Sequence, residues 1–157
     1  MLYKDINKLK EDCEKILKYF KDKCKEFPYG CCAYSSHLLA YVLKNVYKYE
    51  CVLIISGCLK NSNYSHKWVW VNGYIVDLTI SQLNNKWYNF PEIYINECCD
   101  EYNNMFDYLG GILYSTSEFN NENKPIKSII KEYCDLNYTD NNYIAINFDT
   151  KNQDLGD

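Results

Sequence analysis

The residues of this chain that could carry covalent chemistry are its nine cysteines and two histidines. A cysteine becomes a nucleophile when its thiol loses its proton, and both a helix N-terminus and a nearby imidazole favour that loss. Cys31 and Cys32 follow Gly30 and precede an apolar series with helical spacing, so we expect them where a loop becomes a helix. His37 and His66 are then the candidate partners of a reactive thiol.

A predicted β-hairpin places one of the histidines beside an aspartate. The segment HKWVWVNGYIVDLT has strand-forming residues on both sides of Asn72-Gly73, the pair favoured in a two-residue type I′ turn. In this register His66, Trp68 and Asp77 project from one face. His66 and Asp77 are diagonal neighbours, roughly 7 Å apart at the backbone, a span that their side chains can close with a hydrogen bond. Such a carboxylate would fix the ring tautomer and favour the protonated ring, and Trp68 would shield the bond from water.

Three short segments, in this order, resemble the motifs of transglutaminase-like enzymes. Gly30-Cys31-Cys32 with Ser36, Leu38 and Leu43 resembles their G-x-C-x-x-x-A-x-L opening, His66-Lys67-Trp68-Val69 their H-A-W-V strand, and Asp77-Leu78-Thr79 their D-P-T. The resemblance covers residues 27–79, about a third of the chain. Lys67 stands where the family has a small residue and Leu78 where it has proline, which leaves the subfamily open.

The resemblance implies a papain-like, transglutaminase-like fold, in which a helix bearing the cysteine packs on an antiparallel sheet bearing the histidine and the aspartate. It implies that Cys32 is the nucleophile, that His66 is first the general base and then the general acid, and that Asp77 orients His66. The thiol would form an acyl-enzyme intermediate. The backbone N–H of Cys32 is a natural oxyanion donor, whereas no glutamine precedes the cysteine and only Tyr29 or Glu26 could assist.

The expected function is a cysteine-nucleophile acyl-transfer enzyme, a thiol hydrolase that acts on amide, peptide or isopeptide bonds. Two alternatives stay open: a transglutaminase-type or deamidase-type acyltransferase that acts on protein glutamine, and an inactive binding domain that keeps the fold. Protein or peptide substrates are the expected partners, and we expect no cofactor.

Other uses of these residues are weaker. His37 could serve the thiol, but a side chain five positions after Cys32 points elsewhere on a helix. A zinc site is disfavoured because Cys31-Cys32 and Cys98-Cys99 are adjacent pairs whose side chains point apart. We therefore expect no metal, and we interpret the remaining cysteines as structural: Cys13, Cys24, Cys51, Cys58, Cys98, Cys99 and Cys134.

The elements that must position these residues follow from periodicity and turn signals. The sequence predicts helices over residues 3–25 and 32–47 and a buried strand at 51–58, ahead of the hairpin. After the hairpin it predicts a strand at 92–96, a turn at Gly110-Gly111, a helix at 126–133 and a strand at 143–148. Helices followed by antiparallel strands indicate the α+β class.

Composition limits the remaining possibilities. The chain of 157 residues is 47% apolar, which suits one domain over residues 1–150 with a disordered tail at 151–157. A net charge of −4 offers no basic face for a nucleic acid. No secretory signal or membrane-spanning run is recognisable, so we expect a cytoplasmic protein that does not bind a membrane, and its oligomeric state is left open.

Overall fold

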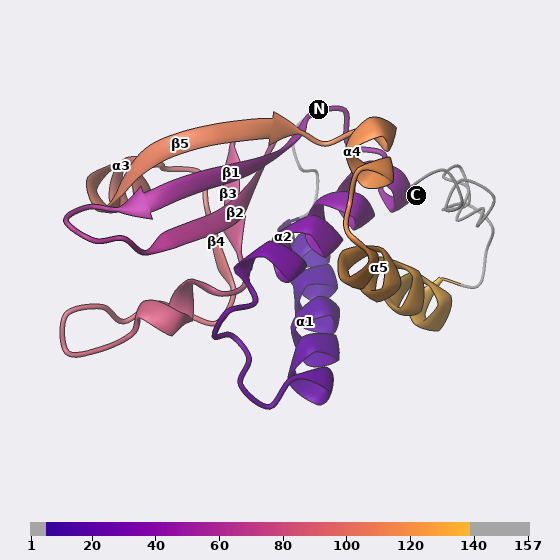
Figure 1. The fold of residues 1–157 in the computed structure, drawn as a ribbon, viewed down its shortest axis with the longest axis horizontal. Coiled ribbons are helices and arrows are strands. Elements are labelled where there is room, and N and C mark those ends of the chain that lie inside the picture. Colours follow the sequence, from indigo (N-terminus) through magenta and orange to yellow (C-terminus); the bar gives the residue numbers. More distant parts are fainter. Residues whose placement is uncertain (1–5, 139–157) are drawn as a thin grey trace, which may run out of the picture.

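A five-stranded antiparallel sheet with the order β4-β3-β2-β1-β5 forms the centre of the fold (Figure 1). The computed structural model describes residues 6–138 of the chain. Its strands are β1 (Val52–Leu59), β2 (Ser65–Val71), β3 (Tyr74–Asp77), β4 (Tyr94–Asn96) and β5 (Phe106–Leu113). The predicted α+β class is confirmed, whereas the strand predicted at 143–148 and the tail at 151–157 lie outside the described residues.

Helices come before, between and after the strands. The longer ones are α1 (Ile6–Lys23), α2 (Cys32–Tyr41) and α5 (Lys124–Asn137), and the short ones are α3 (Asp100–Met105) and α4 (Thr116–Asn120). A π-helical turn, η1 (Val42–Val46), continues α2, and a 3-10 turn, η2 (Ile80–Leu83), follows β3. The three predicted helices are all present. No helix in the described part of the chain combines the length and the apolar character needed to cross a membrane.

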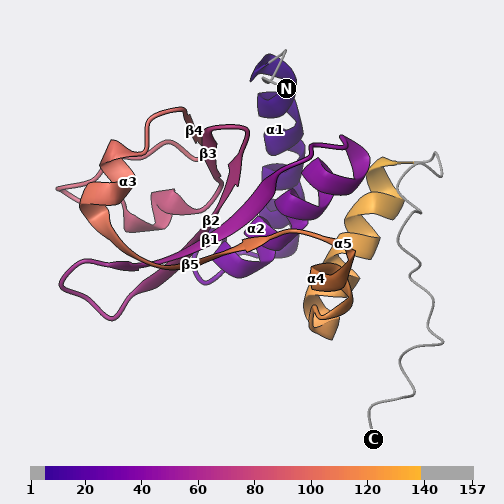
Figure 2. The same ribbon diagram turned by 90° about the horizontal axis from the view of Figure 1, so that it is seen from above.

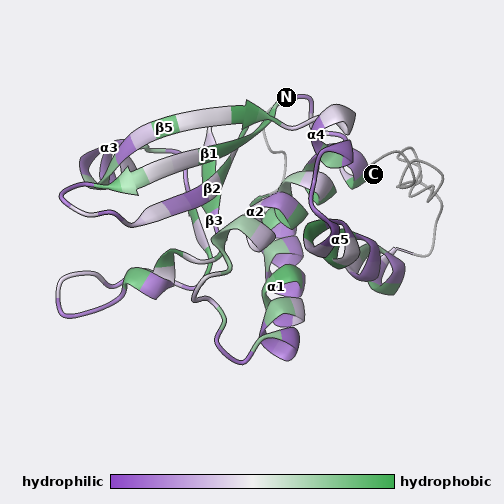
Figure 3. Cartoon of the chain, viewed as in Figure 1, coloured by the Kyte–Doolittle hydropathy of each residue, from purple (hydrophilic) through white to green (hydrophobic). Residues whose placement is uncertain are grey.

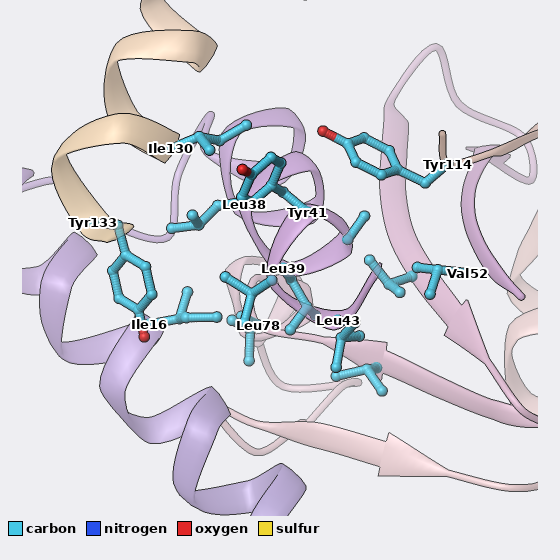
Figure 4. Packing of buried hydrophobic residues seen from close by; sticks show 14 of the residues in the cluster. Ile16, Leu38, Leu39, Tyr41, Leu43, Val52, Leu78, Tyr114, Ile130 and Tyr133 are labelled. Atoms are coloured by element: carbon cyan, nitrogen blue, oxygen red, sulfur yellow. The ribbon is translucent and has the colours of Figure 1, made fainter. Parts of the chain in front are cut away.

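One face of the sheet is covered by helices: α2 packs against β1 and β2, and α1 and α5 pack against α2. Along α1, Leu9, Cys13, Ile16 and Phe20 recur at helical spacing and are buried. Figure 3 shows the resulting alternation of hydrophobic and hydrophilic residues along α1 and α5. In Figure 4, side chains from these helices meet those of α2 and Val52 of β1, which makes this layer the larger core.

The opposite face of the sheet carries a second core that is mostly aromatic. Its buried members are Trp68, Ile75, Ile80, Phe90, Tyr94, Tyr102, Met105 and Phe106. Trp68 and Ile75 come from β2 and β3, and most of the others come from the chain between η2 and the start of β5. Figure 2 shows α3, which belongs to this layer, at the opposite end of the molecule from α4 and α5.

The Asn72-Gly73 hairpin forms as predicted. Both turn residues have positive φ, 48° at Asn72 and 88° at Gly73, the conformation that a type I′ turn requires. Val71 pairs with Tyr74, and the ladder continues to the pair Val69 and Val76. This register puts Val69 and Val76 on the helix-covered face, so that the residues alternating with them, including His66 and Asp77, belong to the aromatic face.

The turn predicted at Gly110-Gly111 is wrong. Both glycines lie inside β5, an edge strand that pairs antiparallel with β1. A Cβ at Gly111 would come 3.0 Å from Cδ1 of Ile55, so the glycine allows the two strands to pack closely. The pairing register shifts between Ser56 and Gly57, where β1 passes the candidate functional residues.

Candidate active site

The two adjacent cysteines face different surroundings at the start of α2. Cys31 is the N-cap residue and Cys32 is the first helical residue. The Cys31 thiol is buried, lies 3.9 Å from the sulfur of Cys24 and donates to the carbonyl oxygen of Tyr29 at 3.5 Å. Burial, with hydrogen bonding to Cys24, raises the pKa of Cys31 to about 11. Cys31 therefore keeps its proton near neutral pH, which makes it the less reactive thiol of the pair.

Cys32 has the opposite electrostatic environment. Partial burial would raise the pKa of its thiol, but hydrogen bonding with His66, the charge of that imidazole and the backbone N–H of Lys67 outweigh burial and lower the pKa. The helix α2 packs against β2 and brings its first residue to the strand that carries His66. The structure thus brings together the cysteine and the histidine that the sequence singled out.

His66 and Asp77 form a buried hydrogen bond. The imidazole Nε2 lies 2.6 Å from Oδ2 of Asp77, and the two side chains are 0% and 1% exposed. The same carboxylate accepts three further hydrogen bonds: from the Tyr102 hydroxyl at 2.7 Å, and from the Thr79 backbone N–H and hydroxyl at 2.9 and 3.2 Å. Because an ionised carboxylate only accepts, Nε2 carries a proton, and Nδ1 is the nitrogen left to act on Cys32.

The His66 ring rests against aromatic side chains. It stacks on Trp68, Phe106 and Tyr64, with ring centroids 6.0, 5.7 and 6.2 Å apart. Gly57 of β1 makes room for this arrangement, because a Cβ there would lie 2.7 Å from the Trp68 ring and 3.1 Å from Cβ of Phe106. Trp68 is 1% exposed and covers the buried pair from one side, as the sequence predicts.

The site favours a protonated imidazole. Burial alone would lower the pKa of His66, but the charge and the hydrogen bond of Asp77, followed by the interactions with Cys32, raise it to about 9. With the thiol pKa lowered at the same time, the proton shared by Cys32 and His66 is displaced toward the ring. A thiolate beside an imidazolium is the form in which cysteine attacks carbon.

Two residues of this cluster were not expected from the sequence. Tyr102, on α3, donates to Asp77, and the side-chain amide of Gln82, on η2, places Nε2 3.0 Å from Nδ1 of His66. Neither lies in a recognisable motif, and both reach the site because the chain folds back over the aromatic face of the sheet. Tyr29 is 64% exposed and Glu26 is also exposed, so both side chains face solvent.

The remaining candidates lie elsewhere. His37 contacts the Glu122 carboxylate, which comes just before α5 in the chain. Cys13 and Cys134 are buried in the helix-covered core, whereas Cys98 is exposed. Among residues 6–138, no three side chains of the His, Cys, Asp and Glu types are grouped as they would be around a metal ion.

Comparisons of the chain with protein-family models, with curated proteins and with solved structures found no match. The geometry of Cys32, His66 and Asp77 is therefore what a functional assignment must be built on.

Proposed function

We propose that this protein is a cysteine-nucleophile acyl-transfer enzyme of the papain-like, transglutaminase-like group, acting as a thiol hydrolase on amide, peptide or isopeptide bonds. The observation that carries the proposal is the buried 2.6 Å hydrogen bond between His66 and Asp77, which leaves Nδ1 of the ring to act on the Cys32 thiol. The residue order Cys, His, Asp and the helix-to-sheet placement of the thiol support the fold assignment.

Acylation starts from the thiolate and the imidazolium. The sulfur of Cys32 attacks the substrate carbonyl carbon, the C–S bond forms, and the carbonyl π electrons move to oxygen. The backbone N–H of Cys32 belongs to the first turn of α2, where N–H groups have no intrahelical acceptor, and it donates to the oxyanion. The electron pair of the oxyanion then re-forms the carbonyl and the C–N bond breaks. The leaving nitrogen takes the proton from Nδ1 of His66, the amine leaves, and a thioester remains on Cys32.

Deacylation reverses the roles of His66. The neutral ring takes a proton at Nδ1 from water, the water oxygen attacks the thioester carbon, and the C–S bond breaks with its electrons returning to sulfur. A carboxylic acid leaves, and the thiolate and imidazolium are restored. An amine in place of water would give the transferase reaction by the same steps, with nitrogen as the attacking atom.

Thiol alkylation tests whether Cys32 is activated. Iodoacetamide should label Cys32 faster than the other cysteines at neutral pH, because its pKa is lowered by His66. The His66→Ala substitution should slow labelling at Cys32 alone, and Cys31→Ala is the matched control that should leave it unchanged. Uniform slow labelling of all nine cysteines would contradict the proposal.

Product analysis tests the reaction itself. A cellular lysate is incubated with the wild-type protein or with Cys32→Ala, and cleaved, deamidated or cross-linked proteins are identified by mass spectrometry. Hydrolysis predicts new carboxyl and amino termini, or side-chain amides converted to carboxylates, that are absent with Cys32→Ala and present with Cys31→Ala. Cross-linked products would assign amine transfer instead, and identical profiles for all three proteins would count against activity on proteins.

A further inference from the structure

Gln82 approaches the nitrogen of His66 on which the proposed chemistry depends. Its Nε2 lies 3.0 Å from Nδ1, while Asp77 holds Nε2 of the same ring. The backbone ties the two partners together: Thr79 donates twice to Asp77, and the backbone N–H of Gln82 donates to the carbonyl oxygen of Thr79 at 3.0 Å. One six-residue segment, 77–82, thus contacts both ring nitrogens of His66.

The chemistry of the neutral ring fixes the direction of the hydrogen bond from Gln82. Because Nε2–H donates to the carboxylate of Asp77, Nδ1 of a neutral imidazole has a lone pair and accepts. The group that faces it must be the N–H of the Gln82 amide. A hydrogen bond to the unprotonated nitrogen stabilises the neutral ring and opposes its protonation.

The thiol of Cys32 competes for the same nitrogen. In the ion pair, Nδ1 carries a proton and donates it to the thiolate, so that the N–H of Gln82 has lost its acceptor. In the neutral pair, Nδ1 accepts from Gln82 and the thiol keeps its proton. Asp77 and Gln82 therefore act on the ring in opposite directions, one favouring the imidazolium and the other the neutral imidazole.

We propose that Gln82 is a positioning residue for His66, which donates to unprotonated Nδ1 and so shifts the Cys32–His66 pair toward its neutral form. The inference rests on the proposed acyl-transfer function. In acylation, the hydrogen bond from Gln82 would make the imidazolium release its proton to the leaving amine more readily. In deacylation, it would hold the neutral ring that activates water in the correct tautomer.

The effects of the other titratable groups on the pKa of His66 can be distinguished from the effect of Gln82. They are Asp77 on β3, Cys32 on α2, Tyr64 before β2, and Tyr102 on α3, which acts through Asp77. Burial raises the pKa of both tyrosines above its ordinary value, so they do not titrate with the imidazole. Cys32 does interact with the ring, and the substitution Cys32→Ala removes it from the measurement.

The first test measures the imidazole pKa directly by NMR, using the full-length Cys32→Ala protein, in which His66 is one of two histidines. Adding Gln82→Leu should raise the pKa of His66 by about half to one unit, the worth of one neutral hydrogen bond. Adding Ser81→Ala, on the same 3-10 turn, should change nothing. A purely structural role would loosen the Asp77 contact and lower the pKa, so a lowered or unchanged value overturns the inference.

The second test measures how substitutions of Gln82 change the reactivity of the Cys32 thiol with pH. With Cys32 present, Gln82→Leu should move the pH profile of iodoacetamide labelling to lower pH, since the ion pair forms more easily. Gln82→Glu should move it to higher pH, because the added carboxylate accepts the hydrogen bond from protonated Nδ1 in place of the thiolate and repels the thiolate charge. Shifts in the same direction overturn the inference about Gln82. The proposed function fails separately, if Cys32 labelling does not depend on His66.

Discussion

Asp77 is the residue on which the candidate site depends most. An uncompensated carboxylate at 2% exposure would be costly, and here four hydrogen bonds from His66, Tyr102 and Thr79 offset that cost. Its charge is the largest of the effects that raise the pKa of His66. The acidity of the Cys32 thiol is therefore set in part by a carboxylate that acts through the imidazole.

Replacing the carboxylate by an amide separates its charge from its shape. In Asp77→Asn the pKa of His66 should fall from about 9, because the imidazolium loses its counter-charge. The pKa of Cys32 should rise, because its interactions with the imidazolium lower it more than the direct repulsion from Asp77 raises it. Iodoacetamide labelling of Cys32 at neutral pH should slow by about tenfold or more, which corresponds to one pKa unit. Tyr102→Phe, which removes one donor and keeps the carboxylate, is the control with a smaller effect. Wild-type labelling in Asp77→Asn would contradict this role.

The sequence predicts the contact between His66 and Asp77 because both residues lie in one hairpin, whose register follows from a two-residue turn. Tyr102 and Gln82 could not be predicted in the same way. Tyr102 lies on a helix that packs back over the sheet, and Gln82 lies in a 3-10 turn with no turn signature of its own. Contacts that depend on how separate segments pack leave no local pattern in a single sequence.

Strand β1 supports the site from beneath, although it contributes no side chain to the reaction. Gly57 pairs with His66 on one side and with Tyr108 of β5 on the other. The space that its missing side chain leaves is filled by the Trp68 ring, on which His66 rests. The pairing irregularity between Ser56 and Gly57 occurs at the same point.

A methyl group at this position should therefore disturb both packing and reactivity. In Gly57→Ala the new Cβ would lie 2.7 Å from a rigid buried ring, so the free energy of unfolding should fall by about 1–3 kcal/mol, measured by urea denaturation. Labelling of Cys32 should also slow as Trp68 moves under His66. Gly111→Ala, whose Cβ would meet only the flexible end of Ile55 at 3.0 Å, should cost less. Equal losses for the two variants would contradict this explanation.

Elements with a strong periodic or turn signal were predicted, and so was β4 within the strand expected at 92–96, whereas β5, α3 and α4 were not. The apolar positions of α1 and the Asn72-Gly73 turn specify their own structure locally. Gly110-Gly111 has the composition of a turn, yet β1 offers an edge with which the segment pairs, and β5 forms instead. The short helices α3 and α4 have too few residues for a periodic pattern to be visible.

Across the whole molecule, buried titratable groups divide between the two faces of the sheet. On the helix-covered face, burial raises the pKa of Cys13, and it raises that of Cys134 to about 12, so these thiols stay protonated until alkaline pH. On the aromatic face burial lowers the pKa of His66, but the charge and hydrogen bond of Asp77 raise it to about 9. The stability of the protein between pH 6.5 and 8 should therefore depend on His66 more than on these core thiols, whose ordinary pKa of 9.0 makes them titrate in the unfolded chain only near pH 9.

Linkage gives the sign of this dependence. In Cys32→Ala the pKa of folded His66 stays above the unfolded value of 6.5, because Asp77 is the main cause that raises it, and lies below about 9, because the interactions with Cys32 are gone. The free energy of unfolding should therefore fall as pH rises from 6.5 through that raised pKa. The fall is at most about 3 kcal/mol, measured by urea denaturation. In the wild type the lowered pKa of Cys32 contributes with the opposite sign and should flatten the curve.

The control for this pH dependence is the double variant Cys32→Ala, His66→Gln, in which no group of the pair titrates. Its free energy of unfolding should be nearly constant between pH 6.5 and 8, below the ordinary pKa of 9.0 at which the buried core thiols titrate in the unfolded chain. If Cys32→Ala alone gives an equally flat curve, His66 does not retain its proton in the folded state.

The loop after η2 is closed by two hydrogen bonds between Asn84 and Phe90. The Asn84 side chain donates to the carbonyl oxygen of Phe90 at 2.9 Å and accepts from its N–H at 2.6 Å, so the two ends of the loop are fastened side by side. Of residues 85–89, which lie beyond this closure, Trp87 is exposed, whereas Tyr88 packs against the aromatic core. The exposed positions are thereby uncoupled from the position of Gln82, and the loop can change in sequence there while the reacting groups keep their geometry.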